Sequence, residues 1–333
     1  MKSLTSILKT LLFLLIGGGL LWHTFKNQDL SLIFSRIKNA DLSWVALSIF
    51  VSIAALISRA MRWKQLIEPL GYKPRLSSAF NAVMFGYAAN MAIPRLGEVS
   101  RCGALSKSDD IPFEKLIGTV IIERTCDVIM LVVCILLSAL FEFELLGGFL
   151  SNHIFNPIIN AVGNSYLLGI ILLVFVIAFI VGYRFILKHY QQHPFIVKVR
   201  TFLKGLADGL IAVTRLENKW LFIFHSLFIW TMYFLMTYVC FFSLPETSGL
   251  SPMAGLFIMV IGAIGMTAPV QGGIGVYHLL VSEGIILYGL TPDDGITFAT
   301  LVHSGQTLLL VLLGGISMIY LFFFTKPISS MKS

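Results

Sequence analysis

Charged side chains are scarce in this sequence. Only 12% of the 333 residues are Asp, Glu, Lys or Arg, whereas 57% are hydrophobic. Soluble domains carry about 25% charged residues, so this composition excludes an ordinary soluble fold. Several apolar runs approach or exceed the ~20 residues that cross a hydrocarbon core. Because the backbone in lipid must satisfy its own hydrogen bonds, these runs predict an all-α, polytopic membrane helix bundle.

Other absences narrow the function. The four cysteines lack CxxC spacing, which gives no support for a zinc site or a disulfide framework. The sequence also lacks HExxH, GxSxG and P-loop motifs, so we expect neither an enzyme nor a bound metal or cofactor. The net charge of +7 does not indicate a nucleic-acid partner, because the cytoplasmic loops of membrane proteins collect Lys and Arg.

Run lengths predict about seven to nine membrane segments in one integral membrane domain that covers the whole chain. The basic and then apolar N-terminus has no A-x-A-like cleavage site, so its apolar run is expected to remain as a membrane span. The long runs lie near 8–23, 43–61, 116–141, 164–186, 219–243 and 296–324, and shorter apolar pieces lie at 78–93, 250–268 and 274–290.

Lys and Arg predict the orientation of these segments. The basic linker at about 187–218 should be cytoplasmic, whereas the loops 142–163 and 244–251 contain neither residue and should be external. Alternation then places both termini on the cytoplasmic side, together with the basic residues that begin with Arg59 and Arg62.

One loop disagrees with that orientation. Alternation makes residues 24–42 external, yet they contain Lys26, Arg36 and Lys38. We keep the assignment, because the remaining loops agree with it.

Two apolar stretches are interrupted. Residues 78–93 begin at the cytoplasmic face and stop at Pro94, and the chain must return to that face by 107–115. The stretch 250–290 begins and ends outside and is broken by "APVQGGIGV". Two broken or re-entrant elements would then enter from opposite faces, which predicts a midplane site of the kind found in inverted-repeat transporters. The alternative is that 250–290 forms two complete short spans.

Six charged residues lie in or beside the predicted membrane segments. Each charge at depth costs about 2.5–3.5 kcal/mol on insertion scales, so they cannot all face lipid unpaired. In one interpretation they pair with one another and only fasten two elements together. We favour a polar cavity open to the cytoplasm, because apolar residues would stabilise the bundle equally well. The six are Arg95, Glu98, Arg101, Glu123, Arg124 and Asp127.

The break in 250–290 supplies a second set of polar candidates. Pro269 ends one apolar piece, and glycines then let the backbone turn and point the positive end of a new helix at a ligand. The alternatives are a plain hairpin packed through small residues and histidines that only pack. The candidates in this region are Gln271, Gly272, Gly273, Gly275, His278, His303 and Gln306.

Four motifs in order resemble a known family. They are "ISRAMRWKQLIEPLGYKP", "FNAVMFGYAANMAIPRLGEVSRCGAL", "IIERTCDVIML" and "APVQGGIGVYH". They look like the lysylphosphatidylglycerol synthase transmembrane region, a flippase-like family related to the membrane half of the multiple peptide resistance factor. The resemblance covers about 11–324. It implies a module of the bacterial cytoplasmic (inner) membrane that moves an aminoacylated phospholipid between leaflets, while a separate soluble domain performs the aminoacyl transfer in fused relatives.

The resemblance also assigns motif positions. Gln271 stands where many members have proline, and His278 stands where many have glutamate, so the resemblance does not identify the lipid. Beyond the residues already named, the matching positions are Arg59, Arg62, Trp63, Asn90, Pro94 and Gly97.

We therefore expect a lipid flippase or transporter that moves a phosphate-bearing headgroup. Arg95, Arg101 and Arg124 would bind phosphate, because guanidinium presents paired donors, and the acids would position these arginines or receive an amine. The lipid would be an anionic or aminoacylated phospholipid or a polyprenyl-phosphate-linked lipid. One alternative is a membrane-embedded transferase that uses the acids as general base, and another is a non-transporting partner of a lipid-modifying enzyme.

Overall fold

The computed structural model describes residues 15, 18–26, 28–145 and 211–324. Within these ranges the regular elements are all helices, which confirms the predicted all-α class. The expected span at 164–186 and most of the basic linker lie outside the described residues. The helices are α2 (Leu30–Asn39), α3 (Leu42–Ile67), α4 (Leu76–Ala92), α5 (Gly97–Asp109), α6 (Phe113–Phe141), α11 (Lys219–Cys240), α12 (Pro252–Thr267), α13 (Val276–Ile286) and α14 (Pro292–Phe324), with 3₁₀ turns η1 (Glu68–Leu70), η3 (Phe241–Ser243) and η4 (Gln271–Gly273).

Three segments in the described part are long and apolar enough to cross a membrane. They are Leu42–Leu70, Lys219–Ser243 and Pro292–Phe323, which contain α3, α11 and α14. Helix α6 is also long, with 29 residues, but it carries three charged side chains near its middle. Helix α12 is a shorter apolar helix of 16 residues. The predicted total of seven to nine membrane segments stays a prediction.

Side-chain caps set where several helices begin. Asp29, Asp41 and Ser251 each accept a hydrogen bond from a backbone N–H of the helix that follows, which satisfies donors that the first turn leaves free. The hydrogen bonds from Ser43 hold the pKa of Asp41 below its ordinary value. These short polar residues therefore mark helix starts that hydrophobic run length alone places only approximately.

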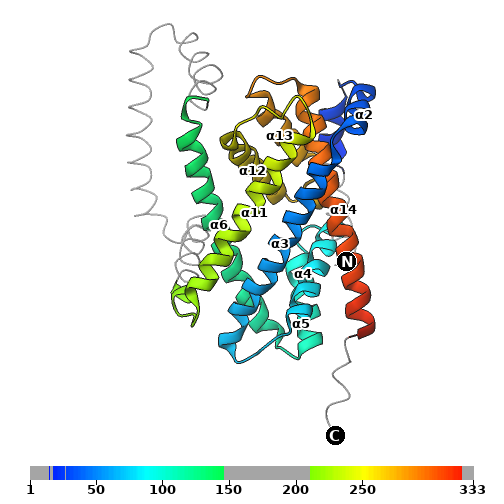
Figure 1. Ribbon diagram of the computed structural model, residues 1–333. Helices are drawn as coiled ribbons and strands as arrows, with labels where there is room; N and C mark the ends of the chain where they lie inside the picture. The colour runs from blue at the N-terminus through cyan, green and yellow to red at the C-terminus, as the bar shows by residue number, and fades with distance from the viewer. Residues whose placement is uncertain (1–14, 16–17, 27, 146–210, 325–333) are drawn as a thin grey trace, which may run out of the picture.

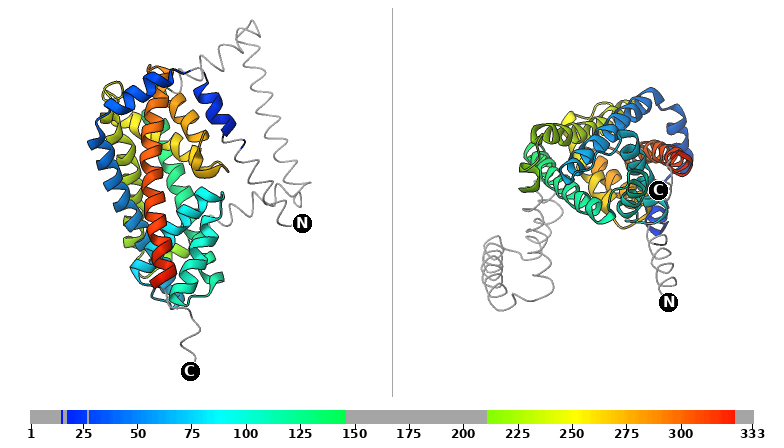
Figure 2. Two further views of the ribbon diagram at one scale, coloured as in Figure 1. Left: turned by 90° about the vertical axis from the view of Figure 1, so that its right-hand side faces the viewer. Right: turned by 90° about the horizontal axis from the view of Figure 1, so that it is seen from below.

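Two helical hairpins lie at opposite ends of the bundle (Figures 1 and 2). Helices α4 and α5 pack together as the first hairpin, α12 and α13 pack together as the second, and α14 runs along the bundle and packs against both. The turns of the two hairpins approach each other, since a Cβ atom added at Gly272 would lie 3.9 Å from Met91 Cγ. The fold thus brings two distant breaks in the sequence together near the middle of the bundle.

Proline and glycine produce both turns. Helix α4 ends at Ala92, and Ile93 is extended because a residue before proline avoids the helical conformation. The chain then turns through Arg95, which has a positive φ of 65°. In the second hairpin Ala268, the residue before Pro269, also leaves the helical conformation, with φ −59° and ψ 144°, and the turn continues through Gly272, Gly273 and Gly275, all with positive φ.

The structure accounts for one of the basic residues in the loop that disagreed with the predicted orientation. Arg36 Nη1 donates to Asp294 Oδ1 at 2.5 Å, and Arg36 Nε lies 3.4 Å from Glu246 Oε1. Asp294 belongs to the first turn of α14, and Glu246 to the loop before α12. Arg36 is thus paired with two acids, and the orientation of this loop stays a prediction, because Asp and Glu contribute little to the positive-inside rule.

Candidate functional site

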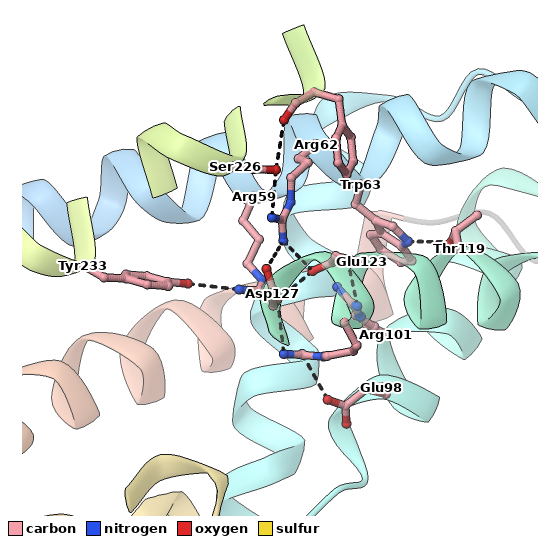
Figure 3. Close-up of polar contacts among 12 residues, drawn as sticks. Arg59, Arg62, Trp63, Glu98, Arg101, Thr119, Glu123, Asp127, Ser226 and Tyr233 are labelled. Atoms are coloured by element: carbon pink, nitrogen blue, oxygen red, sulfur yellow. Dashed lines mark hydrogen bonds and ion pairs between the residues drawn. The ribbon is translucent and has the colours of Figure 1, made fainter. Parts of the chain in front are cut away.

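A group of seven charged side chains lies between α3, α5 and α6, with α11 beside it (Figure 3). Residues three or four apart share one face of a helix, so each helix contributes at least two members. Helix α3 supplies Arg59 and Arg62, and α6 supplies three residues. The charged cluster, as we call it, consists of Arg59, Arg62, Glu98, Arg101, Glu123, Arg124 and Asp127.

Glu123 is the buried centre of the charged cluster and is fully inaccessible to solvent. Its Oε1 lies 2.8 Å from Arg59 Nη2 and 3.6 Å from Arg62 Nη2, and its Oε2 lies 2.9 Å from Arg101 Nη2. An unpaired carboxylate in such a place would be very costly. Three guanidinium groups from two other helices therefore make its burial tolerable.

Asp127 lies one helical turn from Glu123 and shares its partners. Its Oδ1 accepts from Arg62 Nη2 at 2.6 Å, and its Oδ2 accepts from Arg59 Nη2 at 2.8 Å. Helix α11 supplies further acceptors for the two arginines, because Arg59 donates to the Tyr233 hydroxyl at 3.0 Å and Arg62 donates to Ser226 Oγ at 3.3 Å. Figure 3 shows both carboxylates among the guanidinium groups.

Aromatic contacts hold one side of the charged cluster. The Arg101 guanidinium lies 4.7 Å from the ring centroid of Trp63, a cation–π contact that favours a desolvated cation. Trp63 Nε1 in turn donates to Thr119 Oγ1 at 2.9 Å. The ring is thus oriented by α6 and orients Arg101.

Arg124 and Glu98 form the accessible edge of the charged cluster. Their side chains are 44% and 30% exposed, and Arg124 Nη2 lies 3.0 Å from Glu98 Oε1. Arg124 Nη1 also lies 3.7 Å from Asp127 Oδ2. Ion pairs this exposed contribute only about 0–1 kcal/mol, so Arg124 can exchange its carboxylate for another anion at small cost. Four arginines face three carboxylates in the charged cluster, so the cluster as a whole carries one excess positive charge.

Of two hollows in this region, the narrower one is lined by members of the charged cluster and the larger one is not. The narrow one is lined by members of the cluster together with Tyr87, Asn90 and Gly97. The larger cavity of about 280 Å³ lies beyond Arg62, between the end of α3 and the start of α11, and its wall includes Lys64 and His225. His225 Nδ1 lies 2.8 Å from Ser58 Oγ, so this wall is continuous with the helix face that carries Arg59 and Arg62.

The structure gathers five of the six predicted charges and changes the set in two ways. Arg95 makes no ion pair with any described residue and stands outside the charged cluster. Arg59 and Arg62, which the resemblance named only as motif positions and which charge counting placed among the cytoplasmic basic residues, are buried and pair with the carboxylates of α6. Charge counting could not find this, because it ignores pairing. The available signal was the spacing of two arginines on one face at the end of an apolar span.

The remaining motif residues shape the first hairpin. Asn90 Oδ1 accepts from the Gly97 N–H at 2.6 Å across the turn, and Pro94 lies between them. A side chain at Gly97 would collide with the Gly86 carbonyl oxygen and the Asn90 side chain. These residues therefore fix the turn from which Glu98 and Arg101 reach the charged cluster.

The second hairpin holds an uncharged group of polar residues. His303 Nε2 lies 2.7 Å from the Gly272 carbonyl oxygen, so this nitrogen carries the proton and donates. Gln306 is satisfied by two serines of α3, Ser48 and Ser52. His303 and Gln306, predicted as ligand residues, thus also tie α14 to the turn and to α3.

Two buried polar side chains of this group lack partners among the described residues. They are Gln271, through Nε2, and His278, through Nδ1. The His278 ring lies 4.8 Å from that of His303 between centroids. The residues predicted for binding therefore fall into two groups, one charged and one neutral, at the two hairpins.

The described residues contain no group of three or more His, Cys, Asp or Glu side chains placed to hold a metal ion. All four cysteines are buried free thiols.

Comparison with known proteins gives two matches. A sequence profile of the lysylphosphatidylglycerol synthase TM region matches residues 9–314. A UPF0104 membrane protein of Methanocaldococcus jannaschii is 28% identical over 124 residues, which cover 36% of this chain and 37% of that protein. The chain thus aligns with little more than a third of that relative. No solved structure matches the chain.

Proposed function

Because the chain belongs to the lysylphosphatidylglycerol synthase transmembrane region family, an integral membrane family, we propose that it moves a phosphate-bearing lipid headgroup between leaflets. The acyl chains stay in the bilayer while the headgroup follows a polar path through the protein. The charged cluster supplies the anion-binding part of that path, and the polar residues of the second hairpin supply the other part.

One observation carries this proposal, namely a charged cluster that holds one more guanidinium group than carboxylates and has an accessible edge at Arg124. Arg59, Arg62 and Arg101 form ion pairs with the two inner carboxylates, Glu123 and Asp127. Arg124 remains half exposed beside a hollow, with a carboxylate partner that costs little to replace. Its planar fork matches two phosphate oxygens. A structural fastening would need no such excess, because equal numbers of acids and arginines would suffice.

The two hairpins fit this path. In a membrane they would be re-entrant elements that enter from opposite faces and meet near the midplane, where transporters of internally repeated topology bind substrate. The first would start at the cytoplasmic face of a bacterial inner membrane, with both termini on that side. The substrate would be an anionic or aminoacylated phospholipid or a polyprenyl-phosphate-linked lipid, and a lipid-modifying enzyme is a candidate partner.

Reconstitution into liposomes tests the proposal. Vesicles with fluorescent phosphatidylglycerol in both leaflets are treated with a membrane-impermeant quencher, and loss of the protected inner signal reports transbilayer movement. We expect Arg124→Lys to slow this movement about tenfold or more, because hydrogen bonds to charged groups contribute about 1.5–3 kcal/mol. Helix content and thermal unfolding should change little, since the residue is half exposed.

Arg75→Lys is the matched control, because Arg75 is exposed and pairs with Asp109 at 3.6 Å on the far side of the same hairpin. It should move lipid at the rate of the original chain. Equal rates in both variants would reduce Arg124 to a counter-charge. Chemically altered lipid recovered from the same vesicles would instead support a transferase, and vesicles without exchange or chemistry would support a non-transporting partner of another enzyme.

A further inference from the structure

The turn of the first hairpin contains an arginine in an unusual backbone conformation. Arg95 has a φ of 65°, and Asp110 is the one other non-glycine residue with positive φ among those described. The left-handed region is unfavourable for residues with a Cβ atom and is the ordinary place of glycine. Aspartate tolerates it better than arginine does, because its short polar side chain can bond locally. Glycine would therefore serve the turn at Arg95 better than arginine.

The Arg95 side chain is also unpaired and exposed. No hydrogen bond or ion pair joins it to another described residue, although it lies two residues from Gly97 and three from Glu98. It follows the 17-residue helix α4, so it lies about 25 Å along the helix axis from the start of that helix at 1.5 Å per residue. In the proposed orientation α4 starts at the cytoplasmic face, which places Arg95 within the membrane, where an unpaired cation is costly and marks a functional position by default.

The neighbours of Arg95 on the turn are apolar and exposed. Ile93, Leu96 and Val99 are 41%, 36% and 49% exposed. The turn itself is held by the bond from the Gly97 N–H to Asn90, so the four side chains are presented by a fixed backbone. The tip site, as we call Ile93, Arg95, Leu96 and Val99, therefore combines one free guanidinium with a surface that suits hydrocarbon.

We propose that the tip site is a lateral opening of the path, where Arg95 binds the phosphate of a lipid whose acyl chains remain outside the protein against Ile93, Leu96 and Val99. This inference rests on the proposed function and specifies where the lipid joins the path. The accessible edge at Arg124 is close by, since Glu98, its partner, follows Gly97 directly. The phosphate would pass from Arg95 to Arg124 without leaving guanidinium contact.

The variant Arg95→Gly separates this role from stability. It removes the side chain and relieves the backbone, so its midpoint of thermal unfolding in detergent should equal or exceed that of the original chain. Binding of a fluorescent short-chain phosphatidylglycerol, measured by anisotropy in the same micelles, should weaken about tenfold or more. Arg95→Lys keeps the charge and should weaken binding less.

Asp110→Gly is the matched control, because it relieves the other left-handed residue at the end of α5 without touching the tip site. It should leave lipid binding unchanged. Full binding by Arg95→Gly would overturn the inference, as would equal losses in Arg95→Gly and Asp110→Gly.

Competition identifies the source of the phosphate. Dihexanoyl phosphatidylglycerol should displace the probe, whereas inorganic phosphate and dihexanoylglycerol should not, because the tip site needs both charge and chains. Displacement by inorganic phosphate at the same concentration would overturn the lipid opening in favour of a site for free phosphate. If the original chain binds the probe through Arg95 but moves no lipid in vesicles, the tip site stands and the proposed function fails. If Arg95→Gly binds and moves lipid normally, the tip site fails and the proposed function stands.

Discussion

The two hairpins share a backbone design and differ in chemistry. In each, a helix ends just before a proline, the chain turns through residues with positive φ, and a second helix returns to the same end of the bundle. The first hairpin sends Glu98 and Arg101 into the charged cluster. The second is tied through its turn to α14 by the neutral bond between His303 and the Gly272 carbonyl oxygen.

This difference shows where each hairpin gets its stability. Buried charges need partners of opposite sign, so the first hairpin depends on α3 and α6 as well as on its own packing. Neutral polar groups cost less to bury than charges, and α14 contributes one hydrogen bond to the second hairpin, from His303 to the Gly272 carbonyl oxygen. We therefore expect substitutions at the charged cluster to cost far more than matched substitutions at the second hairpin.

The largest effect is expected at Glu123. Glu123→Gln leaves three buried arginines short of negative charge, and breaking a buried ion pair from one side costs about 3–5 kcal/mol. Chemical unfolding in detergent should show a loss of that size. Glu283→Gln on the exposed side of α13 is the control and should change the free energy of unfolding by no more than about 0.5 kcal/mol. Comparable losses in both variants would show that the ion pairs of Glu123 contribute no more to stability than an exposed carboxylate does.

Glycines in the turns should show a smaller contrast. Gly97→Ala forces a Cβ atom against the Gly86 carbonyl oxygen and the hydrogen-bonded Asn90, which should cost about 3 kcal/mol, the upper end of the range for overpacking. Gly272→Ala meets only Met91 Cγ at 3.9 Å, so its cost is the left-handed backbone, about 1–2 kcal/mol.

The control for this pair is Gly103→Ala within α5, where a Cβ atom meets nothing within 4 Å. It should stabilise the protein by about 0.5–1 kcal/mol, because alanine replaces glycine in a helix interior. The midpoints of thermal unfolding should therefore rise from Gly97→Ala through Gly272→Ala to Gly103→Ala. A Gly97 variant as stable as the Gly103 variant would show that the first hairpin is not tightly packed.

The smallest contrast concerns His303 on α14 and His278 on α13, which are buried to a similar extent at 7% and 6% exposure. His303→Phe leaves the Gly272 carbonyl oxygen without its donor and should cost about 1–3 kcal/mol. His278→Phe removes a ring nitrogen that has no partner among the described residues, so it should be nearly neutral. An equal fall in the unfolding midpoints of both variants would mean that His278 makes a hydrogen bond that stabilises the protein as much as that of His303.

Local backbone chemistry made part of the fold predictable. Pro94 and Pro269 break helices wherever they occur, because the ring restricts both its own φ and the preceding residue. The positions of both turns were therefore foreseen, as were the all-α class and the gathering of Glu98, Arg101 and the α6 charges. The basic residues of 24–42 still disagree with the predicted orientation, although Arg36 is paired with Glu246 and Asp294.

By itself, then, the sequence determined that this is a helical membrane protein with two interrupted elements and more charge than lipid tolerates, because composition, run length and proline stereochemistry act locally. Only the tertiary structure decided which charges meet. Glu123 lies 64 residues from Arg59 in the sequence and is paired with it because α3 and α6 pack together at these two residues. Arg95, only three residues from Glu98, lies outside the charged cluster. Pairing depends on how helices cross, and a crossing is set by the packing of whole faces, which no single motif records.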